Sequence, residues 1–316
     1  MKRILLSALI FFSALFLNAQ NVTISGYIED VGSGERLIGA NIFDASDKKY
    51  GTATNSYGFF SLSLPKGKHL ITVSYIGYGF WQTEMDLTKD TSITIQISTD
   101  IKLKQVVIIA KHNQVESSQM GRVDVPVSMI KSLPAMFGEV DVLKTIQLLP
   151  GVQSGTEGSS GVYVRGGGPD QNLILLDGVP VYNANHLFGF FSVFNADAIS
   201  NVALYKGGFP ARYGGRLSSV IDINLKEGNM KKFTGNVSIG LISSKFTIEG
   251  PIVKDKTSFI ISARRTYIDI IAAPFIALGQ KINDPDGKIK FSAGYYFYDF
   301  NAKINHKISN KDRVFF

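Results

Sequence analysis

The chain has 316 residues, no cysteine and a formal net charge of +7. The absence of cysteine excludes disulfides, thiol nucleophiles and thiolate metal sites. The positive charge is spread thinly, without the Lys/Arg tract that nucleic-acid binding needs. The 31 glycines and the aromatic content of 11% favour strands and tight turns over a helical bundle, and the length predicts about two domains.

The first residues predict export from the cytoplasm. Lys2 and Arg3 precede an apolar run at residues 4–17, which is too short for a permanent membrane-spanning helix. Ala19 supplies a small residue at which a peptidase can cleave. Residues 1–19 are therefore predicted to be a removable signal peptide, and an uncleaved membrane anchor is the alternative.

Apolar and polar residues alternate along short runs between residues 21 and 98, for example at Val22 and Ile24. Period two predicts strands that are buried on one face. Turn-forming residues, such as those at 55–58 and 65–67, separate the runs at the spacing of a small sandwich. We expect about seven strands, and a positive φ at Gly58 in its tight turn.

This segment resembles the carboxypeptidase regulatory-like domain. The resemblance rests on ISGYIEDVGSGERLIGANIF and TATNSYGFFSLSLPKGKHLITVSYIGY, with Arg36 where proline is common. It implies an all-β sandwich over residues 20–99. A linked zinc peptidase would need clustered His and Glu ligands, so the scattered histidines predict no enzyme, no catalytic residue, no metal site and no cofactor. They are His69, His112, His186 and His306.

Residues 100–122 are predicted to form a linker that contains a short β-prone run. The run is flanked by lysines and followed by a polar stretch without periodicity. With no obvious core to enter, it is free to pair with the sheet edge of a partner. The alternative is a last strand of the sandwich or a first strand of the next domain. The run comprises Val106, Val107, Ile108, Ile109 and Ala110.

The pattern changes to mixed helix and strand over residues 123–230. Apolar residues at Val142, Leu143, Ile146 and Leu149 form a helical stripe within residues 139–149, and Pro150-Gly151 stops it. The run Gly166-Gly167-Gly168 is not a phosphate cradle, because no Lys-Ser or Lys-Thr follows. Strands are expected at residues 161–165, 172–176, 201–205 and 218–224.

Three ordered blocks in this region resemble the plug domain of TonB-dependent outer-membrane receptors. They are DVLKTIQLLPGV, VYVRGGGPDQNLILLDGVPV and ISNVALYKGGFPARYGGRLSSVIDI. With the preceding sandwich, the chain resembles a Bacteroidetes-type receptor. An unrelated glycine-rich α+β domain would have to match all three blocks by chance.

The resemblance assigns roles to named residues. It implies that Val106 to Ala110 is the TonB box, which a TonB-type energy-transducing protein captures by β-augmentation. Arg165-Gly166 matches the Arg-Gly motif, whose arginine is expected to meet acidic residues of a barrel wall; an exposed strand cap is the alternative. Lys206-Gly207 departs from the usual Arg-Gly-Pro and keeps only the charge. The remaining motif positions are the turns Asp177-Gly178 and Tyr213-Gly214.

A polar and aromatic loop follows the second block. We interpret it as a possible ligand-facing loop at the outer apex of the plug, with ordinary packing as the alternative. Its residues are Tyr182, Asn183, Asn185 and His186.

Residues 231–316 alternate small or polar residues with aromatic ones, as in a barrel wall. Strands are predicted at residues 234–249, 257–267 and 289–308, with a turn at 251–256, a long outer loop at 268–288 and a strand starting at 313. A closed transporter barrel of roughly 22 strands needs far more chain. We therefore expect a fragment that does not transport alone.

The predicted fold class is an N-terminal all-β sandwich, then an α+β plug domain, then the first strands of an incomplete transmembrane β-barrel. The predicted function is the N-terminal portion of an outer-membrane receptor that imports a scarce ligand, such as an iron chelate, glycan or peptide, by energised rearrangement of the plug. The expected partners are a TonB-type protein, the extracellular small ligand and outer-membrane lipid, with no nucleic acid. The alternative is a cell-surface adhesin or partner-binding module that uses the sandwich.

Overall fold

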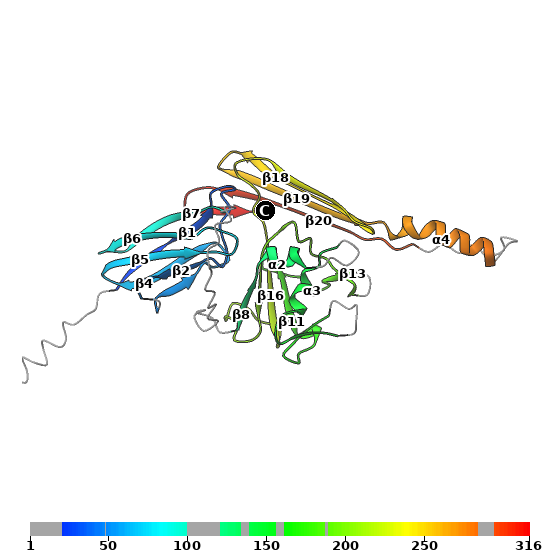
Figure 1. Cartoon of the computed structure of the whole chain (residues 1–316), viewed down its shortest axis with the longest axis horizontal. Coiled ribbons are helices and arrows are strands. Elements are labelled where there is room, and N and C mark those ends of the chain that lie inside the picture. Colours follow the sequence, from blue (N-terminus) through cyan, green and yellow to red (C-terminus); the bar gives the residue numbers. More distant parts are fainter. Residues whose placement is uncertain are drawn as a thin grey trace, which may run out of the picture. The chain divides into compact units, whose positions relative to one another are not determined.

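The computed structural model describes residues 21–47, 49–99, 121–133, 139–155, 161–186, 189–283 and 294–316 (Figure 1). The predicted signal peptide and the predicted TonB box, Val106 to Ala110, lie outside these residues. The chain divides into two compact units. The first comprises Met1–Glu29 and Leu37–Ser118, and the second comprises Asp30–Arg36 and Gln119–Phe316.

The first unit is a two-sheet sandwich, and the prediction of about seven strands is confirmed. One sheet has the order β4-β1-β7 and the other β3-β2-β5-β6. Alternate residues of these strands, such as Ile24, Ile42 and Leu64, fill the core between the sheets. The strands are β1 (Asn21–Asp30), β2 (Asn41–Asp44), β3 (Gly51–Ala53), β4 (Phe59–Pro65), β5 (Gly67–Ser74), β6 (Trp81–Leu87) and β7 (Thr91–Ile97).

Two glycines of the sandwich have conformations that side chains rarely adopt. Gly58 has φ of 69°, which confirms the expected turn geometry. Gly26 has φ of 152°, and a Cβ at this position would lie 1.6 Å from the carbonyl oxygen of Ile93. Gly26 therefore lets strand β1 approach the neighbouring strand β7 more closely than any other residue would.

The second unit begins with a mixed domain, called the middle domain below, over residues 121–230. Its sheet has the order β12-β11-β16-β15-β8, with β11 parallel to β16. Ile130 of α2 and Leu143 and Ile146 of α3 are buried with sheet residues in one core. The elements are β8 (Arg122–Val125), α2 (Val127–Ser132), α3 (Val142–Gln147), β9 (Val152–Ser154), β10 (Val162–Val164), η2 (Pro169–Gln171), β11 (Asn172–Leu176), β12 (Val179–Pro180), β13 (Asn185–His186), β14 (Phe191–Ser192), β15 (Ile199–Tyr205) and β16 (Ser219–Leu225).

Helix α3 is shorter than the sequence pattern predicted. It begins after Asp141, whose Oδ1 accepts a hydrogen bond from the backbone N–H of Lys144 at 3.0 Å, as an N-cap does. It ends at Gln147, before the predicted stop at Pro150. The four strands predicted for this domain are present with shifts of one or two residues at most.

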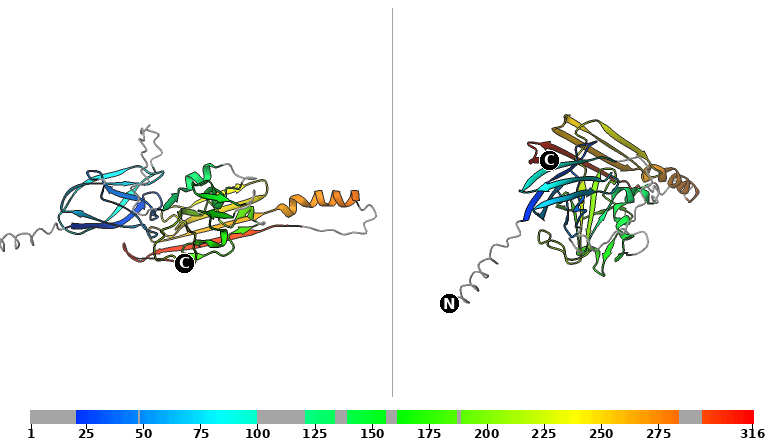
Figure 2. Two further views of the ribbon diagram at one scale, coloured as in Figure 1. Left: turned by 90° about the horizontal axis from the view of Figure 1, so that it is seen from below. Right: turned by 60° about the vertical axis from the view of Figure 1, so that its left-hand side comes forward.

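The C-terminal sheet consists of five antiparallel strands in the order β17-β18-β19-β20-β21. Figure 2 shows these long strands from two further sides, with the helix α4 continuing from one end. The strands are β17 (Thr234–Ile239), β18 (Ser243–Val253), β19 (Thr257–Thr266), β20 (Tyr298–Lys307) and β21 (Arg313–Phe315).

Four sequence predictions in this region are wrong. Strand β18 continues to Val253, so the turn predicted at residues 251–256 is shorter, and β20 begins at Tyr298, so residues 294–297 of the strand predicted at 289–308 are not strand. Residues 234–249 do not form one strand, because a tight turn closed by the hydrogen bond from Gly240 N to Ser243 O folds them into the hairpin of β17 and β18. The predicted loop at 268–288 contains the helix α4 (Ile268–Asn283). Its alanines, Leu278, Gln280 and Lys281 have high helix propensity, and the helix forms although Pro274 lies inside it. No helix of the described residues is long and apolar enough to cross a membrane.

Candidate functional site: a buried ionic contact on the C-terminal sheet

The C-terminal sheet has one polar and one apolar face. On β19 the buried residues Ser258, Ser262 and Arg264 alternate with the apolar residues Phe259 and Ile261. The register places residues of like character side by side on neighbouring strands. We call the side of Arg264 the polar face and the side of Ile261 the apolar face. The apolar face also carries the exposed residues Val237, Phe246, Ile248, Phe300 and Ile304.

Arg264 is the centre of the polar face. Its side chain is only 2% exposed. Its Nε and Nη2 donate to Oδ2 of Asp299 on β20 at 2.9 and 2.6 Å, and Nη2 also donates to the carbonyl of Ser192 at 2.5 Å. Since Ser192 belongs to β14 of the middle domain, one guanidinium joins the two parts of the second unit.

A second pair of charges lies beside Arg264. Lys245 is the register partner of Arg264 on β18, and its Nζ lies 3.4 Å from Oδ2 of Asp197 in the middle domain. Lys131 contacts the other oxygen of Asp197 at 2.8 Å. Burial raises the pKa of Asp197, but Lys131 and Lys245 outweigh it, so the pKa lies below its ordinary value. Asp197 is therefore an anion held by two cations.

Glu139 lies between the two cations of the polar face. Its Oε2 is 3.6 Å from Nη1 of Arg264 and 3.9 Å from Nζ of Lys245, and its Oε1 accepts from the hydroxyl of Ser243. The residue is 4% exposed. A buried carboxylate is tolerable only with such partners, because transfer from water costs several kcal/mol per ion.

An amide, a hydroxyl and a histidine complete the contact. Asn195 donates from Nδ2 to the hydroxyl of Ser262 at 2.6 Å. His186 places Nε2 2.6 Å from Oδ1 of Asp299 and stacks on Phe297 with a centroid distance of 4.0 Å. The contact is thus fully polar at its centre, with a ring stack beside it.

The four residues of the predicted ligand-facing loop are not all available to a ligand. His186 and Asn185 form β13, and His186 is engaged with Asp299. Tyr182 is 87% exposed, and Asn183 is also exposed. In this structure the loop presents Tyr182 and Asn183 outward and uses His186 for attachment to the sheet.

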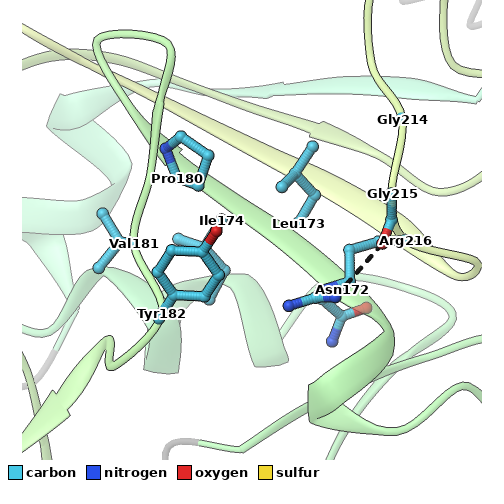
Figure 3. A pocket seen from close by; sticks show the side chains of 9 residues that line it. All are labelled: Asn172, Leu173, Ile174, Pro180, Val181, Tyr182, Gly214, Gly215 and Arg216. Carbon is cyan, nitrogen blue, oxygen red and sulfur yellow. Dashed lines mark hydrogen bonds between the residues drawn. The ribbon is translucent and has the colours of Figure 1, made fainter.

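Tyr182 borders a small open pocket (Figure 3). Its volume is about 170 Å³. Arg216 lies opposite Tyr182 and donates to the carbonyl of Gly215 at 3.3 Å. At the floor, both polar ends of Asn172 are occupied, by the carbonyl of Val162 and the hydroxyl of Ser219. The lining is Asn172, Leu173, Ile174, Pro180, Val181, Tyr182, Gly214, Gly215 and Arg216.

Arg165 and Lys206, the predicted charged motif residues, lie close together. A Cβ placed on Gly207 would be 3.2 Å from Nη1 of Arg165. Lys206 donates from Nζ to the carbonyl of Pro150 at 2.9 Å, and burial together with the Arg165 charge lowers its pKa. Arg165 is exposed and has φ of 49°, and the adjacent Gly166 has φ of 86°. The structure therefore brings both cations to one end of the middle sheet, where strand β15 ends.

The predicted turns are present and carry specific contacts. Asp177 and Gly178 have φ of 48° and 80°. Asp177 also contacts Nζ of Lys303 on β20 at 3.1 Å, which adds an ion pair to the polar face. Tyr213, which precedes Gly214, donates its hydroxyl to Oδ2 of Asp222 at 2.7 Å, and burial together with that carboxylate raises its pKa.

Sequence reasoning missed the charges that hold the two parts together. One signal was present in the sequence: polar and apolar residues alternate along the predicted strands, and the charged residues Lys245, Arg264 and Asp299 fall at the polar positions. Glu139 and Asp197 had no such signal. Within the described residues, no group of three or more His, Asp or Glu side chains is placed to hold a metal ion.

Comparison with known proteins agrees with this architecture. Residues 24–108 match the model of the CarboxypepD_reg-like domain, and residues 123–220 match that of the TonB-dependent receptor plug domain. TonB-dependent receptor P26 of Formosa agariphila is 28% identical over 225 residues, which are 65% of this chain and 21% of the relative. The chain therefore spans about a fifth of the length of this curated relative.

Solved structures that this chain resembles include a siderophore receptor and an outer membrane transporter. The siderophore receptor PirA from Acinetobacter baumannii has a TM-score of 0.42 and 20% identity, with 62% of this chain and 31% of that chain covered. The outer membrane transporter YddB from Escherichia coli has a TM-score of 0.40 and 17% identity, with 60% and 31% covered.

The two matched domains follow each other in the order that the sequence motifs indicated. The relative that matches 65% of the chain carries the same family name. The chain belongs to the TonB-dependent receptors, with a CarboxypepD_reg-like domain ahead of its plug domain, and this is a family of receptors rather than of enzymes.

Proposed function

We propose that this chain is the N-terminal portion of an outer-membrane importer in which the plug is held against a barrel wall by buried charges and is moved by a TonB-type protein. The observation that carries the proposal is the contact of Arg264, Lys245 and Asp299 with the plug residues Glu139, Asp197 and Ser192. The proposed movement of the plug requires no covalent chemistry.

The two faces of the C-terminal sheet support the assignment to a barrel wall. Exposed Phe246, Ile248 and Phe300 on the apolar face suit contact with outer-membrane lipid. The polar face meets the plug and keeps its charges away from hydrocarbon. The wall proposal therefore explains why Phe246, Ile248 and Phe300 are exposed while the side chains of Arg264 and Lys245 are buried.

The chemistry of the contact suits a plug that must hold and also move. An apolar interface would leave exposed apolar surface when it opened, whereas carboxylates, guanidinium and hydroxyls can exchange their partners for water. Two cations against two plug carboxylates give strong but reversible attachment. We infer that pulling from the periplasm breaks these pairs in sequence rather than all at once.

The pulling point in this proposal is the TonB box at Val106 to Ala110, which precedes the plug in the chain. A partner strand would pair with it by backbone hydrogen bonds. The ligand would be an iron chelate, a glycan or a peptide that binds outside the cell. Tyr182 and Asn183 of the plug loop would face it.

The test is energised uptake by the full-length receptor with the substitution Val107→Pro. Proline removes a backbone donor and fixes φ, so strand pairing with the partner should fail while ligand binding persists. Val107→Thr keeps the donor and the β-branched shape, and it is the matched control. Uptake and binding are measured with radiolabelled iron chelate, glycan and peptide, after growth on each as the sole source identifies the ligand.

The expected result is loss of uptake with Val107→Pro, unchanged binding, and normal uptake with Val107→Thr. Undiminished uptake with Val107→Pro would refute the TonB-box assignment. Uptake that persists in a strain without the TonB-type protein would refute the proposed function as a whole.

A further inference from the structure

A short segment of the first sixty residues folds with the second unit. Asp30–Arg36 belongs to that unit, although the chain on either side belongs to the first. The segment is a closed turn: Gly34 N donates to Asp30 O at 2.8 Å, and Asp30 Oδ2 accepts from the backbone N–H and the hydroxyl of Ser33 at 2.7 Å each. It therefore has a defined shape of its own.

The turn is seated on residues 226–231, the stretch that joins the plug to the C-terminal sheet. Met230 N donates to Ser33 O at 2.9 Å, Lys231 Nζ donates to Val31 O at 2.5 Å, and Glu227 N donates to Oε1 of Glu35 at 3.2 Å. These three bonds attach the turn to the joining stretch. They fix the position of the joining stretch relative to the turn.

Strand β21 and the turn before it also hold the segment Asp30–Arg36. Arg313 of β21 donates from Nη2 to Gly34 O at 3.2 Å and from Nη1 to Oε2 of Glu227 at 2.8 Å. Arg36 donates to the carbonyl of Asn310 at 3.2 Å. All these contacts are polar, so the turn can leave its seat without exposing a large apolar surface.

The seat encloses two neighbouring carboxylates. Burial first, and then the adjacent Glu227 charge, raise the pKa of Glu35 from 4.5 to about 7, although Lys226 and the hydroxyl of Ser200 oppose the shift. Burial also raises the pKa of Glu227, against the charges of Arg313, Lys303 and Arg36. Asn305 shares this site, because its Nδ2 donates to Oε2 of Glu227 at 3.1 Å.

We propose that Asp30–Arg36 is a reversible clasp that closes over the plug–sheet junction and holds best when Glu35 carries a proton. The sign follows from linkage: a carboxyl that is a weaker acid in the seated state binds its proton more tightly there, so rising pH favours release. With pKa values of 4.5 released and about 7 seated, opening should increase about 20-fold between pH 5.5 and 7.5. This inference does not depend on ligand uptake.

A single introduced thiol can report the clasp, because these 316 residues contain no cysteine. Met230 is 3% exposed, and its Cβ lies 3.6 Å from the position of a Cβ on Gly34. The variant Met230→Cys in the full-length receptor should therefore react with a maleimide only when the turn lifts. Lys232→Cys, at an exposed position, is the reference, and the ratio of the two rates cancels the pH dependence of thiolate formation.

The expected ratio of rates, Met230→Cys over Lys232→Cys, is low at pH 5.5 and about 20-fold higher at pH 7.5. Adding Glu35→Gln should keep it low at both pH values, since glutamine is neutral and fits the seat. Adding Glu84→Gln, on an exposed part of β6, should leave the pH response intact. These substitutions are made in both cysteine backgrounds.

Three results would overturn the proposal. They are a ratio that does not change with pH, a pH response that survives Glu35→Gln, and a ratio near one at pH 5.5. A double variant supplies a covalent control: the Cβ positions of Gly34→Cys and Met230→Cys lie 3.6 Å apart, within the range of a disulfide, so oxidation should close it and abolish the maleimide reaction at pH 7.5.

Discussion

Replacing Arg264 by methionine should weaken the attachment of the plug to the C-terminal sheet. The guanidinium is 2% exposed and contacts Asp299, Glu139 and the carbonyl of Ser192. Its removal leaves Asp299 and Glu139 buried with fewer cations, and breaking one partner of a buried pair costs about 3–5 kcal/mol. At 1.36 kcal/mol per factor of ten, 3–5 kcal/mol corresponds to about 160- to 5,000-fold more detached plug.

The assay is urea unfolding of the full-length receptor in detergent, with the plug followed by limited proteolysis and the sheet by circular dichroism. Arg265→Met is the matched control, because Arg265 is the next residue on β19 and its side chain is 53% exposed. The double variant Arg264→Met with Asp299→Leu removes both charges of this ion pair and should recover part of the lost stability. Equal midpoints for Arg264→Met and Arg265→Met would refute the view that buried charge holds the plug.

Three further predictions concern the sandwich and the plug helix, each measured as the urea midpoint of the domain in the full-length chain. Gly26→Ala should destabilise the sandwich by about 3 kcal/mol or more, because its Cβ meets the Ile93 carbonyl oxygen; an unchanged midpoint would contradict this. Burial lowers the pKa of His69, but the hydrogen bond to Asp44 outweighs it and the pKa is raised, so the stability of the sandwich should fall as pH rises from 6.5 through the folded pKa. The variant His69→Gln should lack this fall, and a fall that persists in it would exclude the His69–Asp44 pair as the cause. Asp141→Ala removes the cap of α3 and one buried acceptor, and should cost the plug about 2–4 kcal/mol, against no change for Asp170→Ala.

Local patterns predicted the elements of this chain well. Strict alternation identified the strands of the sandwich, because one face of each is buried. The predicted strand at residues 172–176 coincides with β11, because a short apolar run between turn-forming residues is typical of a buried strand. The Asp177-Gly178 turn was predictable for the same reason: its two positive φ values suit an Asp-Gly pair.

Predictions from local sequence patterns failed where a tertiary contact or a short turn determines the structure. The break between β17 and β18 falls at Gly240 to Ile242, which carries no proline and only one glycine, so the alternation ran through it. Helix α4 was read as a loop because outer loops were expected between barrel strands. Glu139 lies more than a hundred residues before its partner Ser243, and Asp197 lies nearly fifty residues before its partner Lys245. No sequence period relates the members of either pair.

The central claim is that the plug is held on the polar face of the wall strands and must shift for transport. Asn195→Cys with Ser262→Cys tests it directly, since these side chains meet at 2.6 Å across the contact. We predict that a disulfide forms in the folded full-length receptor, that oxidised cells bind ligand without accumulating it, and that a reductant restores uptake. Uptake at the normal rate with the disulfide closed would contradict the account.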